Sequence, residues 1–62
     1  MPIVNIQLIE GRSVEKKREL VKKVTEAICE SVDVTPDHVR IILNDMAKED
    51  YAVAGQLIVD KK

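Results

Sequence analysis

Aromatic residues, cysteine and histidine are scarce in this sequence, and their scarcity excludes several kinds of site. Among 62 residues there is no Trp or Phe, and Tyr51 is the single aromatic side chain. A disulfide needs a pair of cysteines and a structural zinc site needs several Cys or His ligands, but the chain offers only Cys29 and His38. We therefore expect no disulfide, no metal site and no cofactor.

An excess of charge of one sign and a long hydrophobic run are also missing. The formal net charge is -1, which gives no general attraction to nucleic acid or to an anionic membrane surface. No apolar stretch is long enough to span a bilayer, and the charged segment that follows the first apolar run is not typical of a signal peptide. We expect a cytoplasmic protein that binds neither nucleic acid nor membrane.

The length of the chain favours association with other copies. We expect one domain over residues 1–62, and at this length a single hydrophobic core is marginal. Hydrophobic residues nevertheless make up 45% of the chain and are mostly Ile, Val, Leu and Ala. This composition predicts that the chain completes its core by forming a homo-oligomer.

Two apolar patterns predict the first strand and the helix. Segment 3–9 alternates with period two and carries apolar groups on both faces, which is typical of a strand covered on both sides. Gly11 can take the turn, and Ser13 is a suitable N-cap for a helix over 14–32. The apolar positions at helical spacing are Leu20, Val21, Val24, Ala27, Ile28 and Val32.

The remaining patterns complete an α/β fold. A second strand is predicted over 39–46 and a short hairpin over 52–59 around Gly55. The order strand, helix, strand is typical of a single β-α-β unit with parallel strands, and parallel strands begin at the same edge of a sheet. Pro2 and Arg40 should therefore lie at a common edge. One helix covers one face of such a sheet, so the open face and edges predict a symmetric oligomer.

Pro2 is the first candidate for chemistry, because it follows a lone Met1 at the start of the first strand. Removal of Met1 would leave a secondary amine that the strand anchors, and such an amine can serve as a base or nucleophile without a side chain. With Met1 attached, the nitrogen is an amide without basicity. The alternative interpretation is that Pro2 only begins the strand, one of the few strand positions that tolerates proline.

Four short motifs stand in a fixed order along the chain. They are Met1-Pro2-Ile3, Glu10-Gly11-Arg12-Ser13, Arg40 early in the second strand, and Met46-Ala47-Lys48 followed by Tyr51-Ala52-Val53-Ala54-Gly55. Their order, spacing and total length resemble the short-chain members of the 4-oxalocrotonate tautomerase (2-hydroxymuconate tautomerase) family. The resemblance implies β-α-β chains assembled as a hexamer, a trimer of dimers, with active sites between chains. It also implies an isomerase of enol and keto acids such as 2-hydroxymuconate, with a place in aromatic compound catabolism.

The resemblance assigns a role to each of four residues. Pro2 would be the general base of a keto–enol tautomerase, and Arg40 would polarise the 2-oxygen and its adjacent carboxylate. Arg12 would bind the remote carboxylate, which suits the planar fork of a guanidinium. Tyr51 stands where several relatives carry Phe as an apolar wall of the substrate site. From the residues alone, Arg12 is interpreted as a solvated loop charge and Arg40 as a strand-edge charge.

Two other functions are compatible with the sequence. The same fold and amino-terminal proline support dehalogenases and decarboxylases of small acids, although those enzymes add an acidic residue beside the proline. Outside catalysis, the chain could be a small oligomeric interaction module in which Pro2 has a structural role only.

Overall fold

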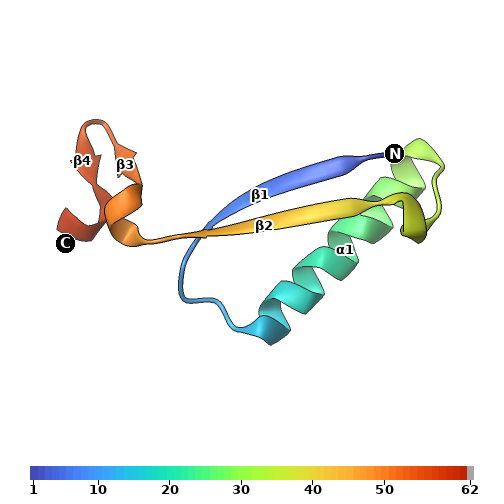
Figure 1. The fold of residues 1–62 in the computed structure, drawn as a ribbon, viewed down its shortest axis with the longest axis horizontal. Helices are drawn as coiled ribbons and strands as arrows, with labels where there is room; N and C mark the ends of the chain where they lie inside the picture. The colour runs from blue at the N-terminus through green and yellow to red at the C-terminus, as the bar shows by residue number, and fades with distance from the viewer. Residues whose placement is uncertain (62) are drawn as a thin grey trace.

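The computed structural model describes residues 1–61 and consists of a β-α-β unit followed by a short hairpin (Figure 1). Strand β1 (Ile3–Ile9) leads into helix α1 (Val14–Val32), which returns the chain to strand β2 (Arg40–Met46). The two long strands pair in parallel. The predicted α/β class, the parallel pair and the connecting helix are confirmed.

The register of the β1–β2 pair fixes which residues share an edge. It runs without interruption from Ile3 opposite Arg40 to Ile9 opposite Met46. Strand β2 begins one residue later than predicted, because Val39 still closes the short 3-10 turn that precedes it. The amino ends of both strands therefore lie at one edge of the sheet, and their carboxyl ends lie at the other.

Helix α1 has the predicted bounds, and its ends explain why. The Ser13 hydroxyl accepts a hydrogen bond from the Lys16 backbone N–H at 3.2 Å, so Ser13 is the N-cap. The chain leaves the helix at Asp33, which takes a left-handed conformation with φ 56°. Within residues 1–61, neither α1 nor any shorter helix combines the length and apolarity needed to cross a membrane.

The chain covers only one face of its own sheet. Figure 1 shows α1 on one side of the β1–β2 pair. The half-buried apolar residues of this layer are Val4, Ile6, Leu8, Leu20, Val21, Val24, Ile28, Ile41 and Leu43. On the other face Ile3 and Ile42 remain 60% and 48% exposed, and no residue within 1–61 is fully buried. The predicted cover on both faces is therefore not met within residues 1–61, which contain a single long helix.

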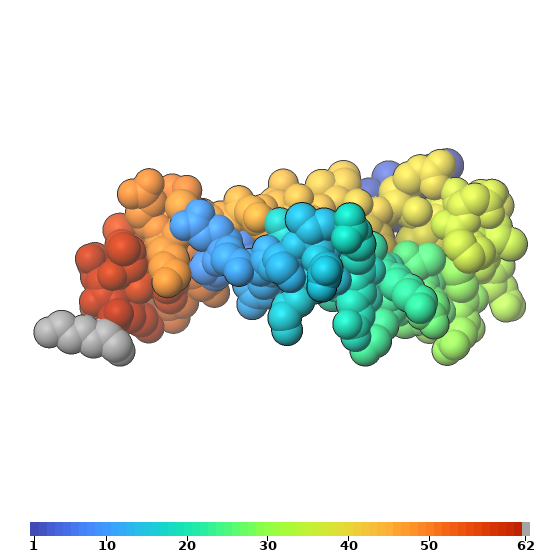
Figure 2. All heavy atoms as spheres, turned by 90° about the horizontal axis from the view of Figure 1, so that it is seen from below, coloured from blue at the N-terminus to red at the C-terminus, as the bar shows by residue number. Residues whose placement is uncertain are grey.

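A two-residue turn closes the predicted hairpin around Gly55. Strands β3 (Ala52–Val53) and β4 (Gln56–Leu57) pair antiparallel, and the turn residues Ala54 and Gly55 have φ of 54° and 81°. Two successive positive φ angles match the hairpin turn that suits the twist of the strands. Figure 2 shows the hairpin and the following segment at one end of an elongated molecule of 43 × 24 × 14 Å.

Replacing Ala54 with Gly should stabilise the protein. A left-handed conformation costs a non-glycine residue about 1–2 kcal/mol, whereas the extra freedom of Gly in the unfolded chain costs about 0.4–1 kcal/mol. We expect the free energy of unfolding in urea to rise by about 0.5–1 kcal/mol. Ala52→Gly is the matched control in β3 and should lower it by a similar amount. Equal losses for both variants would contradict the strain assigned to Ala54.

Candidate active site

Pro2 and Arg40 lie at the same edge of the sheet, as the parallel arrangement predicts. The Arg40 backbone N–H donates to the Pro2 carbonyl at 3.0 Å, which extends the pairing one residue beyond β1. Pro2 is half-buried. The backbone at Pro2 is thus held against β2, and its nitrogen occupies a fixed position instead of belonging to a loose terminal tail.

The chemistry of this nitrogen depends on Met1. Met1 is 78% exposed, so the bond that joins it to Pro2 lies at the surface. While Met1 is attached, the Pro2 nitrogen is a tertiary amide, which is neither basic nor nucleophilic. Removal of Met1 would convert it into a secondary amine at the edge of the sheet.

The side chains of Pro2 and Arg40 lie on opposite faces of the sheet. Exposure alternates along both strands: Pro2 and Val39 are half-buried, whereas Ile3 and Arg40 are exposed. Since successive side chains of a strand point to opposite faces, the Pro2 ring lies on the face that α1 covers and the Arg40 side chain on the uncovered face. The Arg40 guanidinium of the same chain is therefore not directed at the Pro2 ring.

The turn before β2 holds Arg40 at this edge. The Arg40 Nη1 donates to the Asp37 carbonyl at 2.6 Å. The Thr35 hydroxyl donates to the Asp37 carboxylate at 2.6 Å, and this bond is the main reason why the pKa of Asp37 is lowered. His38, in the same turn, is exposed and lies 3.9 Å from the Asp37 carboxylate.

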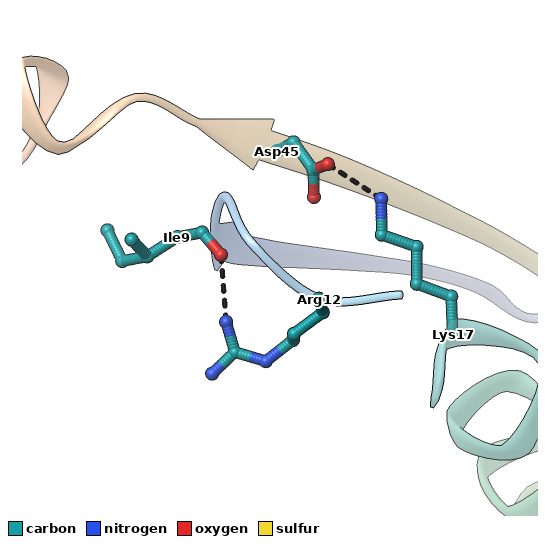
Figure 3. Close-up of polar contacts among 4 residues, drawn as sticks. All are labelled: Ile9, Arg12, Lys17 and Asp45. Atoms are coloured by element: carbon teal, nitrogen blue, oxygen red, sulfur yellow. Dashed lines mark hydrogen bonds and ion pairs between the residues drawn. The ribbon is translucent and has the colours of Figure 1, made fainter. Parts of the chain in front are cut away.

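Arg12 and Tyr51 lie beyond the opposite edge of the sheet. Arg12 belongs to the loop between β1 and α1, and its Nη1 donates to the Ile9 carbonyl at 2.8 Å (Figure 3). Tyr51 follows β2 and is 42% exposed. Its carbonyl accepts the Ile58 backbone N–H at 2.8 Å, so the hairpin segment fixes its backbone. Both residues therefore follow the carboxyl ends of the long strands.

One chain does not bring the four candidate residues together. Strand β1 has seven residues, and at about 3.3 Å per residue it separates Pro2 from the Arg12 loop by about 23 Å. A small dienol acid is much shorter than this distance. The structure thus divides the candidates into two groups, with Pro2 and Arg40 at one edge and Arg12 and Tyr51 at the other.

Sequence reasoning missed a contact close to Arg12. The Lys17 ammonium pairs with the Asp45 carboxylate at 2.6 Å, which links the first turn of α1 to β2 (Figure 3). The partners are 28 positions apart, so no local pattern marks them. Cys29 is a free cysteine that is half-buried in α1.

Two surface hollows lie away from the candidate residues. One is on the charged side of α1, and the other is lined by Glu10, Ala47, Lys48, Glu49 and Val59. Neither includes Pro2, Arg12, Arg40 or Tyr51, so the hollows of a single chain do not mark the predicted site.

The comparison with known families identifies the type of protein. Residues 2–61 match the Tautomerase family, which is described as tautomerase enzyme. This chain belongs to that family. It is 42% identical over 60 residues to the 2-hydroxymuconate tautomerase of Bacillus subtilis, with 97% of each chain covered. The family and the enzyme class predicted from the sequence, a tautomerase and hence an isomerase, are confirmed.

Solved structures show the same fold. The chain is 46% identical to a 4-oxalocrotonate tautomerase isozyme from Methylibium petroleiphilum, with a TM-score of 0.92 over 94% of this chain and 91% of that chain. It is 29% identical to the heterohexameric 4-oxalocrotonate tautomerase of Chloroflexus aurantiacus, with a TM-score of 0.94 over 100% of both chains. The predicted tautomerase fold is confirmed.

Proposed function

We propose that this tautomerase acts on 2-hydroxydienoates such as 2-hydroxymuconate and, once Met1 is removed, uses the Pro2 amine as general base. The observation that carries the proposal is the anchored Pro2, half-buried and joined through its carbonyl to the Arg40 backbone at 3.0 Å. The name of the Bacillus subtilis relative supports the substrate class. The relatives described above are tautomerases, which favours this reaction over dehalogenation, decarboxylation and a binding role.

The reaction moves one proton from oxygen to carbon. In a dienol acid the O–H bond breaks and the oxygen electrons form the ketone carbonyl. The π electrons move along the diene, and a new C–H bond forms at its far carbon, which leaves a conjugated ketone. A neutral amine at Pro2 can take the proton from oxygen and return it to carbon, so the enzyme is unchanged after each turnover.

The surroundings of Pro2 suit a base that works near neutral pH. The reference pKa of an α-amine is about 7.7–8.0, and a secondary amine is intrinsically more basic. Half-burial disfavours the protonated form and lowers the pKa of the amine, and a guanidinium brought to the site by another copy of the chain would act in the same direction. We expect the Pro2 amine to be largely neutral at the working pH, as a general base must be.

The two arginines would divide the recognition of the substrate. Arg40 would polarise the 2-oxygen and its adjacent carboxylate, and Arg12 would bind the remote carboxylate. The Ile9 carbonyl engages one nitrogen of the Arg12 guanidinium, and the remaining donors of this planar fork can hold a carboxylate. We assign Tyr51 to the wall of the same site, because it lies at the Arg12 edge of the sheet.

We further propose that each site is shared between chains of a homohexamer, a trimer of dimers. The separation of about 23 Å along β1 supports this proposal, because the Arg12 that meets a given Pro2 must then come from another copy. Because the Pro2 and Arg40 side chains lie on opposite faces of the sheet, the Arg40 that meets a given Pro2 should also come from another copy. The exposed Ile3 and Ile42 offer an apolar face to a second copy. The predicted cytoplasmic location remains a prediction.

Mixing two inactive variants tests the shared site. Pro2→Ala and Arg40→Ala proteins should be unfolded together, refolded, and assayed with 2-hydroxymuconate. If sites are shared, some hybrids pair an intact Pro2 of one chain with an intact Arg40 of another. The activity of the mixture should then exceed the sum of the two separately refolded parents.

Controls separate the site from the function. Light scattering should show one assembly of the parental mass, and the refolded wild-type protein without Met1 should convert 2-hydroxymuconate. Hybrids of the right mass that gain no activity would place Pro2 and Arg40 of one chain in the same site. A refolded wild-type protein that does not turn over 2-hydroxymuconate would contradict the proposed substrate.

A further inference from the structure

The loop that carries Arg12 is tied at both ends to neighbouring residues of β2. At its start, the Glu10 backbone N–H donates to the Met46 carbonyl at 2.8 Å. Just past its end, the Lys17 ammonium pairs with the Asp45 carboxylate at 2.6 Å (Figure 3). Arg12 lies between the two ties, so its position relative to the sheet depends on both.

Apart from the bond of the Arg12 Nη1 to the Ile9 carbonyl at 2.8 Å, the loop itself adds little to this anchoring. Gly11 has φ 120°, and no atom lies within 4 Å of the place where a Cβ would be, so the turn is not packed against the body of the protein. The Ser13 hydroxyl and carbonyl bond to the backbone N–H groups of Lys16 at 3.2 Å and Lys17 at 3.1 Å. Ser13 therefore moves with α1, and the Lys17–Asp45 ion pair is what joins that end of the loop to β2.

The surroundings of this ion pair distinguish it from an ordinary surface pair. The Lys17 and Asp45 side chains are 27% and 41% exposed, whereas those of Lys23 and Glu19, paired on the same helix, are 72% and 65% exposed. Water and salt screen shielded charges less, so the Lys17–Asp45 attraction is the stronger constraint. Its span between helix and strand also restrains the loop, which a pair within one helix does not.

We propose that Lys17 and Asp45 are positioning residues for Arg12 and, through it, for the remote carboxylate of the substrate. This inference rests on the proposed function, in which Arg12 binds that carboxylate. Lys17 and Asp45 do not touch the substrate. They hold the Arg12 loop beside the end of β2. The Arg12 guanidinium then stays in a position from which it can bind the remote carboxylate.

The test compares a dicarboxylate with a monocarboxylate in protein that lacks Met1. Lys17→Met keeps the aliphatic stem and removes the charge. We expect it to raise the KM for 2-hydroxymuconate about two- to fivefold, the range for a partly exposed ion pair, with kcat nearly unchanged. The KM for a 2-hydroxydienoate without the remote carboxylate should not change. In the Arg12→Ala background Lys17→Met should have no further effect on either substrate, because the group that it positions is gone.

Three further variants separate positioning from general stability. Asp45→Asn removes the other charge of the pair and should raise the KM for 2-hydroxymuconate in the same way. It also tests the pair if the Lys17→Met variant does not fold. Lys17→Arg retains the positive charge of the ion pair and should keep the wild-type KM for 2-hydroxymuconate. Lys23→Met breaks the exposed pair of the same helix and should leave both substrates unaffected. A change of equal size for both substrates, or one that persists in the Arg12→Ala background, would overturn the inference.

The Arg12→Ala variant distinguishes the two ways to fail. If Arg12→Ala leaves the KM for 2-hydroxymuconate unchanged, the proposed role of Arg12 is wrong and the positioning role falls with it. If Arg12→Ala raises that KM while Lys17→Met and Asp45→Asn do not, the function stands and only the positioning role is overturned.

Discussion

Protein that retains Met1 should turn over 2-hydroxymuconate about 100- to 10,000-fold more slowly than protein from which Met1 has been removed, the usual contribution of a general base. The reason is that the retained residue keeps the Pro2 nitrogen as an amide, which cannot accept the proton. Intact mass identifies the two forms, and kcat/KM on each gives the ratio. Full activity in a preparation whose mass includes Met1 would contradict the proposed role of the Pro2 amine as general base.

Pro2→Ala extends this expectation to a variant that still has a free amine. Its kcat/KM should fall sharply, because the variant loses the rigid ring and the secondary amine. The fold should persist, since the Arg40 N–H bonds to the carbonyl of residue 2, which Ala keeps. In wild-type protein from which Met1 has been removed, kcat/KM should rise with pH as a single group, the Pro2 amine, loses its proton. The amine can act as a base only above its pKa.

Arg40→Ala should lower kcat on any 2-hydroxydienoate, whereas Arg12→Ala should chiefly raise the KM for a dicarboxylate. Arg40 would stabilise charge that grows on the 2-oxygen in the transition state. Arg12 would bind the remote carboxylate equally well in the ground state and in the transition state. Loss of a hydrogen bond to a charged group costs about 1.5–3 kcal/mol, which corresponds to a roughly 10- to 150-fold change.

Steady-state kinetics on a matched pair of substrates, with and without the remote carboxylate, separates the two roles. The monocarboxylate serves as the internal control for Arg12→Ala, because it lacks the group that Arg12 would bind. Substrate-independent losses of the same size at Arg12 and Arg40 would show that the division of roles is wrong.

Local patterns in the sequence were sufficient to predict the fold, because each has a short-range cause. The N-cap at Ser13 and the turn at Gly55 depend on residues within a few positions, and strand alternation arises because successive side chains point to opposite faces. The rule for parallel strands placed Pro2 beside Arg40. The same rule places Arg12 at the opposite edge, since it follows β1.

The parts of the candidate site that could not be predicted from the sequence depend on long-range geometry. Lys16, Lys17 and Arg18 are equivalent as a basic run, and only the way α1 crosses the sheet selects Lys17 to meet Asp45. The faces of the other copies, which the proposed site needs, are set by association and leave no periodic mark within one chain.

The absence of any fully buried residue among positions 1–61 changes what stability means for this protein. An isolated chain holds a fraction of a hydrophobic core, so in the proposed homohexamer much of the favourable free energy of its apolar side chains would come from contacts between molecules. Folding and association would then form one equilibrium, and the fraction of folded protein would depend on its concentration. Positions such as Ile3 and Ile42, which look like surface in one chain, would respond to substitution as core positions do.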